Sequence, residues 1–323
     1  MRIAQEKWDR AFEIGILPQR RDLLLLGYLP VMALLAWLTP EAAWPRICAS
    51  AARFSGFAGQ KRDENARQIA RLLAGRVPEG DTDRITAGIA AHHHHARLQL
   101  FRSYRFDSWR PRMTLIGRQH VEQALAARSG AVLWVAPFVY NSLVTKMALH
   151  QAGFAVSHLT GPQHGVSSSG FGQRFLNPIW SGVERRFLAA RVLMTSEQSP
   201  AALRELIRRT KDNQLVSITM GPNGRRRYDA PFFAGRLAVA NGGPALARRT
   251  GAPLLPVFTV RSADGAFVTT VEAPVQLRDD LDGDESERQL TAHCVRLLES
   301  YVWRAPDQFD GWAMATAERT AEP

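Results

Sequence analysis

Cysteine is nearly absent from this chain of 323 residues, which contains only Cys48 and Cys294. Two thiols so far apart make neither a disulfide framework nor a cysteine metal site, and they fit a reducing compartment. Zinc-finger spacing, an RNP-like aromatic motif and a basic heptad region are missing as well, so nucleic acid is not expected as a partner. No small-residue cleavage site of a convincing kind follows the N-terminal apolar run, so we do not expect a removable signal peptide.

Lysine is also scarce, and arginine therefore supplies nearly all of the positive charge; the only lysines are Lys7, Lys61, Lys146 and Lys211. The formal net charge is nevertheless +11. An excess of this size favours an anionic partner, such as a phospholipid surface, a phosphorylated substrate or an acidic carrier protein. A general compositional bias toward arginine is the competing explanation.

The longest apolar run, Leu23 to Leu38, contains Gly27 and Pro30 and is flanked by arginines on both sides. At 1.5 Å per residue a helix of this length reaches roughly 24 Å, short of the ~30 Å hydrocarbon core. Basic residues beyond both ends also disagree with the positive-inside tendency of spanning helices. We therefore expect a kinked helix lying in the cytoplasmic leaflet, while a spanning helix and a soluble core helix remain alternatives.

From residue 130 onward short apolar runs alternate with helical patterns, which is typical of an α/β fold with a mixed sheet. The expected strands are 132–136, 155–159, 215–219, 254–260 and 267–273. The expected helices are 142–151, 170–180, 200–211, 243–250 and 285–303. Before them, residues 62–125 read as mostly helical and basic. The block His92–His95 in that region points around all sides of a helix, so it predicts a solvated or membrane-facing polar patch, not a metal site.

Three stretches carry a resemblance to a known family: Ala131 to Ser142, Gly224 to Gly235, and Asn241 to Phe258. Together they resemble the late lipid A (lauroyl/myristoyl) acyltransferases, within the lysophospholipid acyltransferase-like superfamily. The tail Pro306–Trp312 is similar to the family's Pro-Glu-Gln-Trp segment in part, but it lacks the histidine that follows there. The resemblance therefore extends over nearly the whole chain.

This resemblance implies a glycerolipid-acyltransferase-like mixed sheet flanked by helices, with residues 1–55 as membrane-associating helices and 56–323 as the acyltransferase-like domain. It implies an inner-membrane protein on the cytoplasmic face that needs no cofactor. Its partners would be the phospholipid surface and an acyl carrier protein or acyl-CoA. Acyl-chain length, acceptor, donor and oligomeric state do not follow from the sequence.

The family's catalytic pair is missing. In the family this strand ends in His-Phe-x-x-x-Asp/Glu, and the pair deprotonates the attacking hydroxyl; here Pro137 and Ser142 occupy the two positions. None of the chain's histidines has an acid five positions later, so the motif has not moved elsewhere. The protein is therefore either an acyltransferase with substitute groups or a catalytically inactive lipid- or carrier-binding accessory protein.

Substitute groups are available close by. Ser142 and Lys146 lie four residues apart on one helix face, an arrangement that serves as nucleophile and base on other folds. Asn141 can donate to an oxyanion. In a second interpretation Ser142 is only a helix cap and Lys146 is solvated. More distant base candidates are His120, His158 and His164.

A second candidate site follows Gly224. Arg225, Arg226 and Arg227 are kept in kind with the family, and guanidinium groups on a flexible loop suit phosphate or carboxylate. The segment Pro231, Phe232 and Phe233 offers an apolar edge for an acyl chain. Three arginines on a loop are also often no more than a solvated turn, and that alternative stays open.

Overall fold

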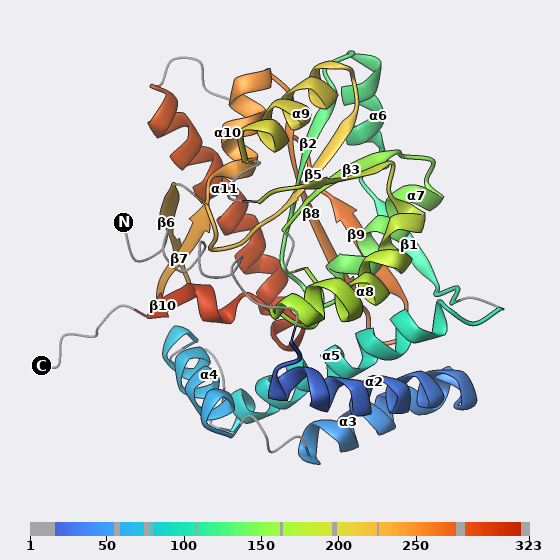
Figure 1. Ribbon diagram of the computed structural model, residues 1–323. Helices are drawn as coiled ribbons and strands as arrows, with labels where there is room; N and C mark the ends of the chain where they lie inside the picture. Colours follow the sequence, from blue (N-terminus) through green and yellow to red (C-terminus); the bar gives the residue numbers. More distant parts are fainter. Residues whose placement is uncertain are drawn as a thin grey trace, which may run out of the picture.

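The computed structural model describes residues 17–54, 59–73, 78, 80–106, 109–161, 164–195, 199–224, 226–275 and 282–317. A seven-stranded sheet runs through the centre in the order β1-β9-β8-β2-β5-β3-β4 (Figure 1). Its neighbours run parallel except for the antiparallel pair β8 and β9. The strands are β1 (Met113–Ile116), β2 (Ala131–Val135), β3 (Val156–Thr160), β4 (Ala190–Leu193), β5 (Leu215–Thr219), β8 (Leu254–Arg261) and β9 (Phe267–Val271). The expected α/β fold with a mixed sheet is confirmed.

Strand β2 lies between β8 and β5, and all of its residues are buried. A strand with parallel neighbours and both faces covered must be apolar throughout, which is why this segment is readable as a continuous apolar run. The helices that flank the sheet are α6 (Arg118–Ala126), α7 (Lys146–Gln151), α8 (Asn177–Glu184), α9 (Ser199–Lys211) and α10 (Gly242–Thr250). Both α7 and α8 are preceded by a π-helical turn, Asn141–Thr145 and Gly172–Leu176. Single π turns occur often at functional sites.

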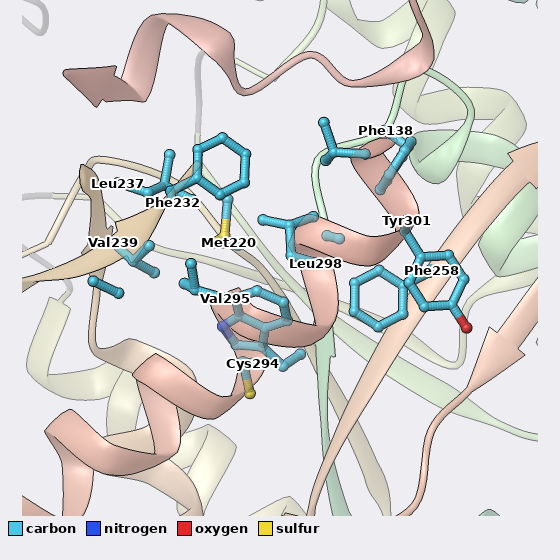
Figure 2. Packing of buried hydrophobic residues seen from close by; sticks show 14 of the residues in the cluster. Phe138, Met220, Phe232, Leu237, Val239, Phe258, Cys294, Val295, Leu298 and Tyr301 are labelled. Carbon is cyan, nitrogen blue, oxygen red and sulfur yellow. The ribbon is translucent and has the colours of Figure 1, made fainter. Parts of the chain in front are cut away.

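A small antiparallel sheet of β10, β7 and β6 covers one side of the long helix α11 (Gly283–Arg304). Its strands are β6 (Arg227–Phe232), β7 (Gly235–Ala240) and β10 (Ala315–Ala317). Figure 2 shows Phe232, Leu237 and Val239 from this sheet beside Val295 and Leu298 of α11. Further along the same helix, Tyr301 stacks on Phe258 of β8 with ring centroids 4.0 Å apart.

Four helices form a layer below the sheet in Figure 1: α2 (Arg20–Leu38), α3 (Trp44–Phe54), α4 (Gly59–Leu72) and α5 (Asp81–Arg102). Helices α2, α3 and α4 each pack against α5. One side of α2 is buried through Leu29, Met32 and Ala36. The other side exposes a row of large apolar side chains: Leu23, Leu24, Leu26, Val31, Leu34, Trp37 and Leu38. The division of the chain near residue 55 stays a prediction.

The histidine block lies in α5, and its expected role as a polar patch is wrong. His92 and His95 both hydrogen-bond to the hydroxyl of Tyr140, at 2.7 and 3.2 Å. His93 pairs with Asp310, and His94 hydrogen-bonds to the hydroxyl of Tyr28 at 2.9 Å. The rings point around the helix as expected, but each direction meets another part of the protein. The block therefore joins α5 to α2, to the loop after β2 and to the C-terminal tail.

Candidate functional site

A cavity of ≈ 790 Å³ opens where β2 ends. Carboxyl ends of parallel strands are the usual position of ligand sites in α/β proteins. Part of its lining comes from α2 and α5, including Arg21, Leu25 and Leu100. Toward the other end it is lined by Asn223, Gly224 and the first turn of α10. The cavity thus extends from the N-terminal helices across the edge of the sheet.

One wall of the cavity consists of Pro137, Asn141 and Ser142, and we call it the strand-end wall. Its backbone is held by the C-terminal tail: the Pro137 carbonyl accepts from the Asp310 N–H at 2.8 Å, and the Val139 N–H donates to the Gln308 carbonyl at 2.9 Å. The Asn141 side chain donates to the carbonyl of Ala136 at 2.9 Å. The tail and the amide thus fix the backbone conformation at the end of β2.

A second wall carries the charge. Lys146, His158 and His164 line the cavity, with the Glu184 carboxylate behind them, and these four residues are called the charged wall below. Lys146 Nζ lies 2.6 Å from Glu184 Oε2, and His164 Nε2 lies 2.8 Å from Glu184 Oε1. The Glu184 side chain is 1% exposed, that of Lys146 6% and that of His164 27%. His164 is thus the member most open to the cavity.

The charged wall is electrostatically balanced around Glu184. Burial raises the pKa of this carboxyl, but the Lys146 charge and the hydrogen bond from His164 outweigh burial and hold the pKa well below its usual range. Burial lowers the pKa of Lys146, and the Glu184 charge opposes that shift. Burial and the Lys146 charge push the pKa of His158 well below its ordinary value, so this imidazole is neutral. Its Nδ1 lies 2.8 Å from the Ser217 hydroxyl.

The structure brings together several residues that the sequence analysis singled out. Ser142, Lys146, Asn141, His158 and His164 all line one cavity. The interpretation of Lys146 as solvated is wrong, because its ammonium group is buried against Glu184. Ser142 does not cap a helix either; it lies inside the π-helical turn, whose N-cap is Tyr140. A catalytic role for Ser142, Lys146 or Asn141 stays a prediction.

Glu184 is the residue that the sequence analysis missed. It lies twenty positions after His164, whereas the family's motif has its acid five positions after the histidine. Only the folded structure brings the segment after β3 beside α8. No fixed spacing in the sequence predicts that contact. The remaining base candidate, His120, belongs to α6, away from the cavity lining.

The described residues of the segment Arg226–Phe233 do not line the cavity. Arg225 lies outside the described residues. Arg226 is exposed and pairs with Asp284, and Arg227 begins strand β6. Phe232 is fully buried against Phe309 and Trp312, while the cavity lining from this region ends at Gly224. Contacts of Arg225–Arg227 and Pro231–Phe233 with substrate stay predictions.

Neither Cys48 nor Cys294 lines the cavity. Both thiols are buried and form no disulfide. Within the part of the chain that the structure describes, no group of three or more His, Cys, Asp or Glu side chains is arranged to hold a metal ion. The cavity lining offers imidazole groups that can transfer protons, beside a buried carboxylate and an ammonium group.

The chain is similar to the 1-acyl-sn-glycerophosphate (LPA) acyltransferase PlsC from Thermotoga maritima, at 12% identity over 81% of this chain and 98% of that chain, with a TM-score of 0.38. No curated protein matches. The sequence model of the family described as bacterial lipid A biosynthesis acyltransferase matches residues 20–312. The chain belongs to this bacterial lipid A biosynthesis acyltransferase family.

Proposed function

We propose that the protein transfers an acyl chain from a thioester to a hydroxyl of a lipid A- or phospholipid-like acceptor. The observation that carries this proposal is the cavity at the end of β2, which lies within the residues that match the family and has the volume of a small-molecule site. Its lining combines apolar side chains such as Leu25, Leu100 and Leu246 with polar side chains such as Asn141, Lys146 and His164. An acyl chain can pack on the former while its ester carbon meets the latter.

A non-catalytic role is the second candidate, and one specific observation favours it. Pro137 has no group that can take or give a proton and no N–H that could help an oxyanion, and Ser142 is not an acid. A protein that keeps the cavity without proton-transfer chemistry would bind the lipid or the acyl carrier as an accessory component.

Turnover separates the two candidates. Purified protein is incubated with acyl carrier protein thioesters and coenzyme A thioesters, over lysophospholipid and lipid A precursor acceptors. Formation of acylated lipid with release of thiol supports the transferase. Binding of the same lipids, measured by equilibrium dialysis, without any product would favour the accessory protein. A Pro137→His, Ser142→Glu variant that gains activity would show that the remainder of the site is intact.

The place of action proposed here is the cytoplasmic face of the inner membrane, with α2 lying in the leaflet. Helix α2 is the one described helix that is long and apolar enough to cross a membrane. The helix, however, packs along α5, where the Trp37 indole donates to the Phe101 carbonyl and Arg102 donates to the Ala36 carbonyl. A spanning α2 would draw the histidines and arginines of α5 into hydrocarbon, at high cost. A helix with its outer row in the leaflet avoids that cost.

Flotation with vesicles of phosphatidylethanolamine and phosphatidylglycerol tests this contact. Leu24 and Leu34 are each 56% exposed, and replacing both by Glu should abolish flotation, because two charges would enter the acyl region. Ile116→Glu on the edge strand β1 is the matched control, since Ile116 is also half-exposed and apolar. Release of the unchanged protein by high salt alone would contradict an inserted helix.

A further inference from the structure

His164 lines the cavity, whereas its carboxylate partner, Glu184, is buried behind it. Both carboxylate oxygens of Glu184 lie within 2.9 Å of His164 Nε2. Since Glu184 is ionised, it accepts a hydrogen bond from Nε2–H and thereby fixes the tautomer of the ring. The lone pair is then on Nδ1. The side chain is 27% exposed and lines the cavity, so this nitrogen is accessible to a molecule bound there.

The segment that carries His164 is held firmly. The side-chain carbonyl of Asn177 accepts from the N–H groups of Val166 and Ser167, at 2.9 and 3.0 Å. Gly165 has φ +145, and a Cβ there would lie 2.4 Å from the Asn177 side chain, so the close approach requires glycine. The Ser167 and Ser169 hydroxyls, in turn, donate to the buried carboxylate of Asp22 in α2. A side chain on a braced segment keeps a fixed geometry, as proton transfer requires.

Lys146 connects this arrangement to the strand end. It begins α7, directly after the π-helical turn that contains Ser142, and its ammonium group shares the Glu184 carboxylate with His164. The imidazole and the helix that follows Ser142 are therefore joined through one buried carboxylate. The family's pair uses neighbouring positions in sequence, whereas these groups come from the segments that follow β2 and β3 and from α8.

We propose that His164 is the catalytic base and acid of this protein, with Glu184 as its positioning residue and Lys146 as the counter-charge that keeps Glu184 in place. The proposal rests on the acyl-transfer function proposed above. Nδ1 takes the proton of the acceptor hydroxyl as its oxygen forms a bond to the thioester carbonyl carbon. The carbon–sulfur bond then breaks, and the imidazolium returns the same proton to the leaving thiolate. The products are the acylated lipid and the free thiol, so atoms and charge balance.

The rate of acyl transfer by His164 variants tests the proposal. His164→Gln should lower kcat by about 10²–10⁴-fold, the usual contribution of general acid–base catalysis. His164→Ala should be equally slow and should regain part of its rate on addition of free imidazole. His293→Gln is the matched control, because His293 is exposed on α11 and should turn over like the unchanged protein. Unfolding by urea confirms that each variant is folded.

The pH profile adds a readout that a purely structural role would not move. Among the described residues, the carboxylate of Glu184 bonds His164 directly, and Lys146 of α7 and His158 of β3 belong to the same charged cluster, with Arg191 of β4 acting on His158 and Glu184. Glu184→Gln should shift the acid limb of the rate profile to lower pH, since the imidazolium loses its carboxylate partner. The same limb should keep its position in the His293→Gln control.

The outcomes distinguish a failure of the proposed role of His164 from a failure of the proposed acyl-transfer function. If the unchanged protein turns over and His164→Gln does so within threefold, His164 is not the base, while acyl transfer stands. If the unchanged protein binds lipid and makes no product with any thioester, the transferase function fails and the role of His164 falls with it. If His164→Gln does not fold, His164→Asn replaces it, and a failure of imidazole to restore any rate in His164→Ala overturns the proposal.

Discussion

The two walls of the cavity stabilise the site by different means. The strand-end wall is held by backbone hydrogen bonds to the C-terminal tail and by the Asn141 amide, and neither Pro137 nor Ser142 carries a charge. The charged wall depends on one buried carboxylate that is shared by an ammonium group and an imidazole. The first wall has a fixed backbone but no residue that can act as a proton-transfer pair. The second wall holds titratable groups from three separate segments. Backbone shape and proton-transfer groups therefore come from different parts of this cavity.

The largest expected effect on stability comes from the buried ion pair of the charged wall. Lys146→Met leaves the Glu184 charge without its main partner, which typically costs about 3–5 kcal/mol of unfolding free energy. Urea unfolding followed by circular dichroism measures the loss. Lys146→Met combined with Glu184→Leu should cost less than the single change, since no unpaired charge then remains.

The matched control is the exposed pair of Arg208 and Glu205 on α9, at 2.8 Å. Arg208→Met should cost far less than Lys146→Met, because solvent screens this exposed pair. Equal losses for Lys146→Met and Arg208→Met would remove the distinction between a charged wall and an ordinary surface.

A smaller effect should appear as a pH dependence of stability that comes from His95, which contacts Tyr140 in the loop after β2. Burial, with the nearby Arg261 charge, lowers the pKa of His95 to about 3, so the folded protein keeps this imidazole neutral. The unfolded chain binds its proton near pH 6.5. Stability from His95 is therefore complete above pH 6.5 and falls as the pH drops from 6.5 toward 3, by at most about 1.4 kcal/mol per pH unit.

Urea unfolding of the unchanged protein and of His95→Gln between pH 7 and 5 measures this dependence. The variant is expected to be less stable at pH 7, because it loses a hydrogen bond to Tyr140, and to depend less steeply on pH. His293→Gln should retain the original slope. Parallel slopes for all three proteins would mean that His95 is protonated in the folded state.

Much of the fold was predictable because buried strands in a parallel sheet are apolar throughout. Strands 215–219 and 254–260 were predicted to within a residue of their ends, and helix 285–303 likewise to within two. The strands that were missed are β1, β4, β6, β7 and β10. Strands β1 and β4 lie at the edges of the main sheet and are only four residues long, each with one polar residue, so neither forms a continuous apolar run. Strand β6 carries an arginine, an aspartate and a proline, which favoured a loop in the sequence analysis.

The site was predictable only as far as it follows the chain. Ser142 and Lys146 were found because four residues make one helical turn. The burial of Lys146 against Glu184 was not predicted. Helix geometry places a side chain on a face of the helix and does not reveal what packs against that face. His164 was only one base candidate among several. Its partner Glu184 becomes visible only when the parallel strands bring the end of β3 beside α8.

The carboxylate of Asp22 ties α2 to a wall of the cavity. Ser167 and Ser169 donate to it from the segment that begins at His164. Removal of α2 would leave two buried hydroxyls without their acceptor, at about 1–3 kcal/mol for each unsatisfied group. A shortened protein, prepared for solubility, would then lose the brace of its imidazole at the same time as its lipid contact. Failure of such a protein to turn over would report a loosened cavity wall, whether or not a membrane was ever needed for the chemistry.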